Sequence, residues 1–180
     1  MLKQIHSDRI ERIDGGRGYL GEGDALVSDR PGVLVGVRTA DCVPILIADP
    51  EHHAVAAVHA GWRGTAEGIV AKAVSRLTDE YGSKPRDLHA ALGPSIGRCC
   101  YEVGPEVVSR FRPWLPDVPA GEKAYLDLTG VNQRQLTHAG ISVANIYTGS
   151  PCTNCGPAEL HSYRRDGPKA GRMIAAIGIL

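Results

Sequence analysis

The sequence predicts an α+β fold built around mixed β-sheets. Three strand-like segments follow one another without an intervening helix, and the later helices and strands do not alternate regularly, which argues against a doubly wound α/β fold. The 180 residues are enough for one substantial core and contain no internal repeat or low-complexity stretch. We therefore expect a single domain over residues 1–180.

The first group of elements is a run of strands rich in β-branched and small apolar residues. We expect these strands at Val33–Arg38, Val43–Asp49 and Ala54–His59, because each run is short, apolar and bounded by turn residues. The segment 50–53, Pro-Glu-His-His, is typical of a turn. The second and third strands should therefore be neighbours in a hairpin.

The next element is a helix that begins near Gly64, runs to about Tyr81 and ends at Gly82. Its signal is an apolar stripe at helical spacing. The stripe consists of Ile69, Ala73, Val74, Leu77 and Tyr81. The remaining predictions are a strand at His89–Gly93, helices at Glu106–Phe111 and Val131–Ala139, a loop at Pro113–Gly121, and strands at Val143–Tyr147 and Met173–Leu180.

Composition favours some classes of partner over others. The chain carries 20 basic and 20 acidic residues, so no overall basic field favours nucleic acid or an anionic membrane. No apolar run reaches transmembrane length, and the first residues do not form a signal peptide. The odd count of 5 cysteines favours reduced thiols over a disulfide framework. We expect a cytoplasmic protein.

Cys42 and His59 give the strongest chemical signal. If Asp49 faces Ala54 across the turn, Pro44 faces His59, and Cys42 lies two residues further on the same face. Diagonal cross-strand neighbours are roughly 7–8 Å apart, which suits two ligands of one ion. A register shift of one residue would separate them, and Cys42 would then be an ordinary small buried side chain.

His6 completes a possible ligand set, although no spacing argument places it. Two imidazoles and one thiolate suit zinc or another borderline-soft metal, and three protein ligands leave the fourth position open for catalysis. Asp41, beside the thiolate, is a candidate either to orient His59 or to act as a base. Both roles remain open.

Arg63 and Gly64 mark a candidate anion site. They lie where the predicted helix begins, and a helix N-terminus with an adjacent guanidinium favours an anion. The alternative is a tight turn with a surface arginine. Tyr163 and Arg165, in the polar segment 161–166, either belong to a solvated turn or line a pocket for an anionic or aromatic ligand.

The Pro-Cys-x-x-Cys segment at Cys152 and Cys155 matches half of the zinc nucleobase-deaminase signature. The other half, His-x-Glu, is absent. A zinc ribbon needs a second Cys-x-x-Cys pair, which the adjacent Cys99 and Cys100 do not form. We therefore expect Cys152 and Cys155 to be free thiols and not metal ligands.

Taken together, these motifs resemble the YfiH-like, or laccase-domain, family, which is also labelled multicopper polyphenol oxidase. The order and number of the matching segments make the resemblance specific. They are Gln4-Ile5-His6, 23–27, Thr39-Ala40-Asp41-Cys42-Val43-Pro44, His59-Ala60-Gly61-Trp62-Arg63-Gly64, 93–104, 126–128, Asn132, Gln135-Leu136, Cys152-Thr153, 162–167 and Gly171-Arg172.

The resemblance implies a layered α/β sandwich with mixed β-sheets, and zinc bound by His6, Cys42 and His59. It also implies phosphorolysis of purine nucleosides, so that a purine nucleoside and phosphate are the expected substrates. Adenosine deamination and methylthioadenosine phosphorolysis are the implied side activities. The laccase label implies copper and phenol oxidation, which we rank second because the chain has no His-x-His pair and only 7 histidines.

One difference from the family concerns the N-terminus. Family members usually carry a further segment before the motif that begins here at Gln4. A shortened chain would leave a sheet edge exposed, which a second copy would cover in a homo-oligomer. It also makes a catalytically silent metal-binding protein a third hypothesis.

Overall fold

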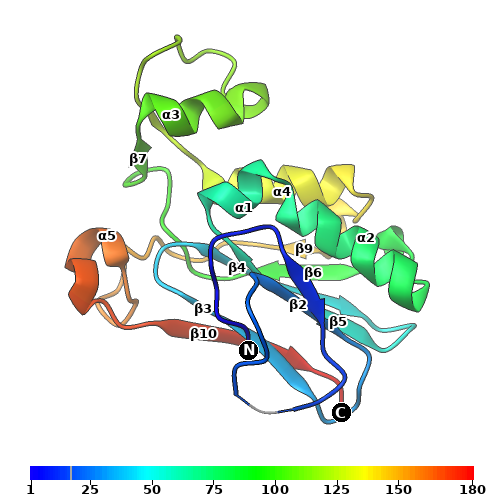
Figure 1. Cartoon of the computed structure of the whole chain (residues 1–180). Coiled ribbons are helices and arrows are strands. Elements are labelled where there is room, and N and C mark those ends of the chain that lie inside the picture. The colour runs from blue at the N-terminus through cyan, green and yellow to red at the C-terminus, as the bar shows by residue number, and fades with distance from the viewer. Residues whose placement is uncertain (17) are drawn as a thin grey trace.

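Three layers stack in the molecule, and the middle layer is a mixed six-stranded sheet (Figure 1). The computed structural model describes residues 1–16 and 18–180. Helices α1 (Trp62–Ala66), α2 (Ile69–Tyr81) and α4 (Leu128–His138) cover one face of the sheet. The antiparallel pair β3 (Leu34–Thr39) and β10 (Met173–Gly178) covers the other. The predicted α+β class with mixed sheets is confirmed.

The central sheet has the strand order β1-β2-β5-β4-β6-β9. Its inner pairs are antiparallel, whereas the two outermost pairs, β1 with β2 and β6 with β9, are parallel. The strands are β1 (Ile10–Arg12), β2 (Ala25–Ser28), β4 (Val43–Asp49), β5 (Ala54–Ala60), β6 (His89–Leu92) and β9 (Ile146–Tyr147).

The middle sheet is buried on both faces, which explains why its central strands are apolar throughout. Every residue of β5 is buried. On the helix side, Ile45 and Val58 pack with Leu77 of α2 in the main core. On the other side, Ala57 packs with Val37 of β3 in a second, smaller core. A strand between two apolar layers needs no alternation of polar and apolar residues.

The predicted hairpin register is confirmed. Asp49 pairs with Ala54, and Pro44 pairs with His59. The short turn leaves little freedom in how the two strands align, and burial of both faces opposes a shift of the register. The strands β3, β4 and β5 lie within one residue of their predicted bounds.

The predicted continuous helix from Gly64 to Tyr81 is wrong, because the structure divides it into α1 and α2. Gly68 separates them with φ of 75°, a left-handed conformation that favours glycine. The end of α2 is as predicted, since Gly82 also adopts a left-handed conformation, with φ of 74°.

Several later elements differ from their predicted bounds, and α4 begins three residues earlier than the predicted helix at Val131–Ala139. The expected helix at Glu106–Phe111 is α3 (Pro105–Val108) followed by a 3₁₀ turn over Ser109–Trp114, which also takes the first two residues of the expected loop at Pro113–Gly121. Most of the expected strand at Val143–Tyr147 is a 3₁₀ turn over Val143–Asn145. Two further 3₁₀ turns cover Pro85–Asp87 and Gly167–Lys169.

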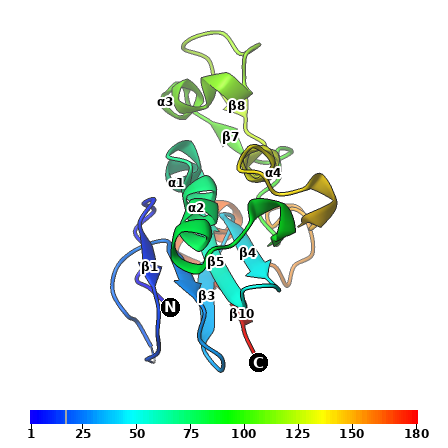
Figure 2. The ribbon, with the colours of Figure 1, turned by 90° about the vertical axis from the view of Figure 1, so that its right-hand side faces the viewer.

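The sequence analysis did not predict five short elements: β1, β2, β7 (Glu102–Val103), β8 (Ala124–Tyr125) and α5 (Tyr163–Asp166). Figure 2 shows α3, β7 and β8 together beyond α1 and α4, on the side away from the sheet. Among the described residues, no helix is long and apolar enough to cross a membrane.

The β3–β10 layer carries exposed apolar side chains. Leu34 is 70% exposed and Ile174 is 64% exposed. The expectation that a second copy of the chain covers an exposed edge stays a prediction.

Candidate functional site

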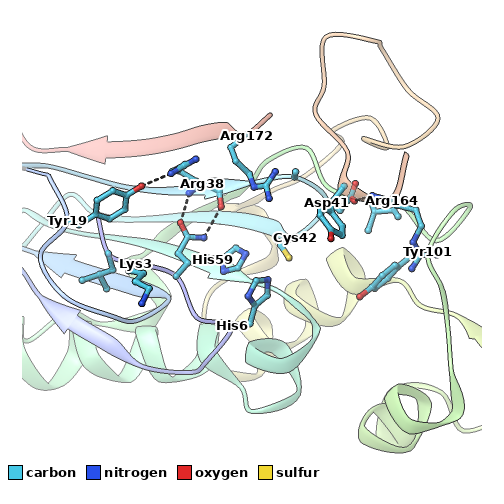
Figure 3. Close-up of a pocket in the computed structure, with 15 residues that line it drawn as sticks. Lys3, His6, Tyr19, Arg38, Asp41, Cys42, His59, Tyr101, Arg164 and Arg172 are labelled. Carbon is cyan, nitrogen blue, oxygen red and sulfur yellow. Dashed lines mark hydrogen bonds between the residues drawn. The ribbon is translucent and has the colours of Figure 1, made fainter. Parts of the chain in front are cut away.

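His6, Cys42 and His59 converge at one end of the sheet (Figure 3). Each offers a ligand atom, and the three atoms lie within 4.8 Å of one another. His59 is buried near the end of β5, Cys42 directly precedes β4, and His6 is exposed on the N-terminal segment. The arrangement has the composition of a three-ligand metal site with one side open to solvent.

Gly61 leaves the space in which these ligands meet. A Cβ atom at this position would lie 3.1 Å from the Cys42 sulfur and 3.2 Å from Cδ2 of His6. The backbone there, with φ of −75° and ψ of 171°, is open to any residue. Crowding, and not backbone conformation, is therefore the reason for glycine at this strand-to-helix junction.

Asp24 positions both histidines. One carboxylate oxygen, Oδ1, lies 2.8 Å from Nδ1 of His59 and accepts the backbone N–H of His6 at 3.0 Å. The other, Oδ2, accepts the N–H groups of Ile5 and Ser7 and the Ser7 hydroxyl. With Nδ1 bonded to Asp24, His59 presents Nε2 to the ligand cluster.

Charge around the cluster favours the thiolate that a metal needs. Burial raises the pKa of Cys42, but hydrogen bonds with His59 and His6 outweigh it and lower this pKa to about 7. Burial likewise opposes the charge on His59, whereas Asp24 and Cys42 raise its pKa to about 9. Burial also raises the pKa of Asp24, but the hydrogen bonds of this carboxylate with His59 and Ser7 outweigh burial and lower the pKa to about 2. A metal ion binds the thiolate form of Cys42, so metal binding would release the thiol proton.

Two residues of the site hold left-handed backbone conformations without being glycine. His6 has φ of 58° and Asp41 has φ of 87°. Such conformations cost about 1–2 kcal/mol, so the surroundings must hold them in place. Asp24 does so for His6, while Asp41 accepts hydrogen bonds from Thr153 Oγ1 at 2.6 Å and from the Arg164 N–H at 2.7 Å.

The structure bears on the two candidate roles of Asp41, which were to orient His59 or to act as a base. Asp24, and not Asp41, is the carboxylate bonded to His59. Asp41 instead lines the cavity beside the ligand cluster, so its role as a base stays a prediction. The sequence analysis did not assign Asp24 a role, because only the fold brings its carboxylate to His59.

A cavity of about 700 Å³ opens beside the three ligands (Figure 3). Its four cationic side chains, from Lys3, Arg38, Arg164 and Arg172, outnumber the one carboxylate, Asp41, so it favours an anion. Aromatic and apolar side chains supply flat surfaces for a ring. The full lining is Leu2, Lys3, Gln4, His6, Tyr19, Arg38, Ala40, Asp41, Cys42, His59, Ile96, Tyr101, Tyr163, Arg164 and Arg172.

The structure separates the two residues predicted from the segment 161–166. Tyr163 lines the cavity. Arg165 does not, because its guanidinium donates to the carbonyl oxygens of Thr153 and Leu160 and pairs with Asp166. The neighbouring residue Arg164 lines the cavity instead of Arg165.

Arg63 and Gly64 lie in α1 and are not among the residues that line the cavity. Arg63 is exposed, and its guanidinium lies 4.4 Å from the centre of the Trp62 ring. Gly64 is buried, and a Cβ atom there would lie 2.8 Å from the Ser7 carbonyl oxygen. The Thr65 N–H donates to the Gly61 carbonyl, so it is not free for an anion. The anion site at Arg63 is untested, and these contacts favour the alternative, a tight turn with a surface arginine.

The spacing argument did not predict that Cys99 and Cys100 come together with Cys152 and Cys155, as they do in the structure; the expectation that Cys152 and Cys155 are not metal ligands is not tested by this proximity. The four sulfur atoms lie within 4.8 Å of one another. The spacing argument required two Cys-x-x-Cys pairs. In the fold, the adjacent cysteines Cys99 and Cys100 lie beside the single Cys-x-x-Cys pair instead.

The layered α+β fold therefore carries a candidate active site, in which the ligand set for a metal ion lies beside a cavity with cationic and aromatic walls. The chain belongs to the family described as multi-copper polyphenol oxidoreductase laccase, whose model matches residues 1–180.

Relatives in this family carry other names. A purine nucleoside phosphorylase of Clostridium acetobutylicum is 41% identical, over 98% of this chain and 75% of the relative. A protein from an unknown prokaryotic organism, named adenosine deaminase RL5, is 40% identical over 98% of this chain and 73% of its own length. The crystal structure of YlmD from Geobacillus stearothermophilus matches with a TM-score of 0.91 at 38% identity, over 99% of this chain and 72% of that one.

Proposed function

We propose that the protein is a zinc-dependent purine nucleoside phosphorylase. The observation that carries the proposal is the position of the His6–Cys42–His59 cluster in the wall of a cavity with both aromatic and cationic side chains. A purine base suits the aromatic surfaces, and phosphate suits the cations. Relatives named purine nucleoside phosphorylase support the same substrates.

The three ligands fit zinc. Two imidazoles and one thiolate are a set that zinc binds with its fourth position open, and Asp24 fixes the orientation of His59 as carboxylates do in zinc sites. When bound there, zinc would act as a Lewis acid toward an oxygen or nitrogen atom of the substrate.

The chain's own residues would hold the two substrates. Tyr101 is half-buried and Tyr163 is exposed, and both line the cavity as candidate surfaces for the base. Arg38 and Arg172 would hold phosphate close to the sugar. In phosphorolysis, a phosphate oxygen forms a bond to the anomeric carbon while the bond from that carbon to the purine nitrogen breaks, and the departing base takes up a proton. Asp41 is the cavity's one carboxylate beside the cluster and is the candidate for moving that proton.

Side activities follow from the same proposal. The cavity would also accept methylthioadenosine, which keeps the purine and the sugar. Adenosine deamination is supported by the relative named adenosine deaminase RL5.

A copper-dependent phenol oxidase is the second candidate, because the family description names one. Two imidazoles and a thiolate also bind copper. However, only two of the seven histidines lie in the cluster, and among the described residues the other candidate metal group contains cysteines alone. The side chains do not provide the many imidazoles that several copper ions require.

Metal analysis and a phosphate-dependence assay test the proposal together. We expect Cys42→Ala to remove about one equivalent of zinc per chain and to abolish release of base from adenosine or inosine, because loss of one of three protein ligands weakens a catalytic site severely. His53→Ala, at an exposed histidine outside the cluster, is the matched control and should retain both.

The release of base by the wild type should require phosphate. Copper in place of zinc together with oxidation of a phenol would establish the second candidate. Zinc at the cluster with no turnover of any purine nucleoside would establish the third hypothesis, a catalytically silent metal-binding protein.

A further inference from the structure

Cys99, Cys100, Cys152 and Cys155 form a second cluster, separate from His6, Cys42 and His59. The first two cysteines lie in the turn that follows β6, which is closed by hydrogen bonds from the Cys100 and Tyr101 N–H groups to the Gly97 carbonyl. The other two lie in the loop between β9 and α5. All four are free thiols, and their sulfur atoms lie within 4.8 Å of one another.

We propose that these four cysteines bind a structural zinc ion as a closed tetrathiolate site. Zinc–sulfur bonds of about 2.3 Å in tetrahedral geometry place the sulfurs about 3.8 Å apart. The Cys99 and Cys155 sulfurs are 3.6 Å apart, so small adjustments would bring the set to zinc geometry. Four protein thiolates leave no open position, which is the pattern of a structural and not a catalytic zinc.

The backbone around the cluster is arranged for thiolates. The Gly97 N–H donates to the Cys152 sulfur at 3.2 Å, a bond that stabilises negative charge on a ligand.

Two glycines leave the space that the cluster needs. A Cβ atom at Gly97 would lie 3.3 Å from both the Cys99 sulfur and Cβ of Cys152. A Cβ atom at Gly156 would lie 2.2 Å from the Cys152 carbonyl oxygen, which accepts the Gly156 N–H at 2.8 Å. Gly97 therefore leaves room for the sulfurs themselves, and Gly156 allows the close turn of the backbone at Cys152.

The proposed zinc would also fix one wall of the cavity. Thr153, between the cysteines, donates its N–H to the Ser95 carbonyl and its hydroxyl to the Asp41 carboxylate. The Thr153 carbonyl in turn accepts from Arg165, in the helix that carries Tyr163 and Arg164. A metal ion that joins the two loops would thereby hold Asp41, Tyr163 and Arg164 in place without touching the substrate.

Zinc counting by native mass spectrometry tests the site on protein expressed with zinc and purified under a thiol reductant. We expect two zinc ions per wild-type chain and one in Cys42→Ser. We also expect one in the Cys99→Ser/Cys155→Ser variant and none when all three substitutions are combined. A wild-type chain with a single zinc that Cys42→Ser removes would overturn the proposal.

Cobalt loading gives a second measurement that does not depend on the double variant folding. In Cys42→Ser, the remaining cysteines are the four of the cluster, so strong thiolate-to-cobalt charge-transfer absorption would come from them. Absence of that absorption would overturn the proposal, as would a Cys99–Cys155 disulfide in protein kept under reductant. Iron with inorganic sulfide in place of zinc would overturn the choice of metal.

Discussion

At the scale of single residues, Asp24 determines how the candidate metal centre is assembled. Five hydrogen-bond donors from Ile5, His6, Ser7 and His59 converge on its carboxylate. A carboxylate suits this position because it only accepts hydrogen bonds. One fully buried side chain thus joins the N-terminal segment, which supplies His6, to the strand that supplies His59.

The substitution Asp24→Asn tests this role. The asparagine NH₂ group would face N–H donors, so at least one buried bond would be lost and His59 would be held less firmly. We expect zinc affinity at the His–Cys–His cluster to fall roughly tenfold to hundredfold, as is usual when the partner of a ligating histidine is changed. Competition with a chelator of known affinity measures it.

Ser7→Ala is the matched control for Asp24→Asn. It removes one hydrogen bond to the same carboxylate but leaves the bond to His59 intact, so it should cost about 1 kcal/mol of stability with little change in zinc affinity. Equal losses of affinity in the two variants would show that Asp24 supports the fold and does not orient the ligand.

The residues of the site differ in how far the sequence predicts them. Cys42 and His59 were predictable because they flank one short hairpin, so the strand register places them on one face. His6 was supplied only by the family resemblance, and Asp24 was assigned no role. Their partners lie many residues away, and only the finished fold brings them together: His59 and Asp24 are separated by 35 positions.

At the scale of elements, two glycines between β5 and α2 are required for different structural reasons. Gly61 leaves room for the ligand cluster, whereas Gly68 allows the turn between α1 and α2. The apolar stripe predicts α2 but does not reveal this break, because the sequence between Trp62 and Ile69 is compatible with a continuous helix. Gly68 was the available signal, since glycine weakens a helix and permits a positive φ.

Substituting each glycine by alanine should distinguish the two reasons, because one substitution should affect zinc binding and the other stability. Gly61→Ala places a methyl group against Cys42 and His6, so we expect zinc binding at that cluster to weaken at least tenfold. Gly68→Ala meets no atom within 4 Å but forces φ of 75° on alanine, so it should lower stability by about 1 kcal/mol.

Thermal unfolding and zinc counting on both glycine variants check this prediction. Gly68→Ala should retain full zinc at the His–Cys–His cluster. Normal zinc affinity in Gly61→Ala would show that the ligands can move aside, and the argument from crowding would fail.

The cysteine cluster could not be predicted from single elements, because it joins two loops that are remote in the sequence. Cys152 lies 55 positions from Gly97, whose N–H it accepts, and the two loops meet through an isolated bridge between Ser95 and Cys152. Short-range spacing predicts hairpins and helix faces, but it does not predict which two loops a mixed sheet places side by side.

At the scale of the whole molecule, the cavity is assembled from segments that are remote in the chain. Lys3 comes from the N-terminus, Arg38 from β3, Arg164 from α5, and Arg172 directly precedes β10. Although the chain has no net charge, its fold gathers positive charge at this one place. Overall composition indicates that there is no general basic field, but it does not reveal this local gathering of cationic side chains.

Arg172 and Arg63 represent two competing positions for phosphate. Arg172 lines the cavity and lies 5.9 Å from the centre of the Tyr163 ring, whereas Arg63 is exposed on α1. We expect Arg172→Ala to raise the KM for phosphate roughly tenfold to hundredfold, because a charge-assisted hydrogen bond contributes about 1.5–3 kcal/mol. Arg63→Ala should leave that KM unchanged.

Initial rates at varied phosphate and fixed adenosine measure the effect, and zinc content should match the wild type in both variants. Arg172→Lys, which retains the charge but loses the planar fork, should fall between Arg172→Ala and the wild type. The reverse pattern, a large effect of Arg63→Ala and none of Arg172→Ala, would place phosphate at the start of α1. That position requires a nucleoside bound with its sugar toward Arg63, and the substrate orientation proposed here would then be wrong.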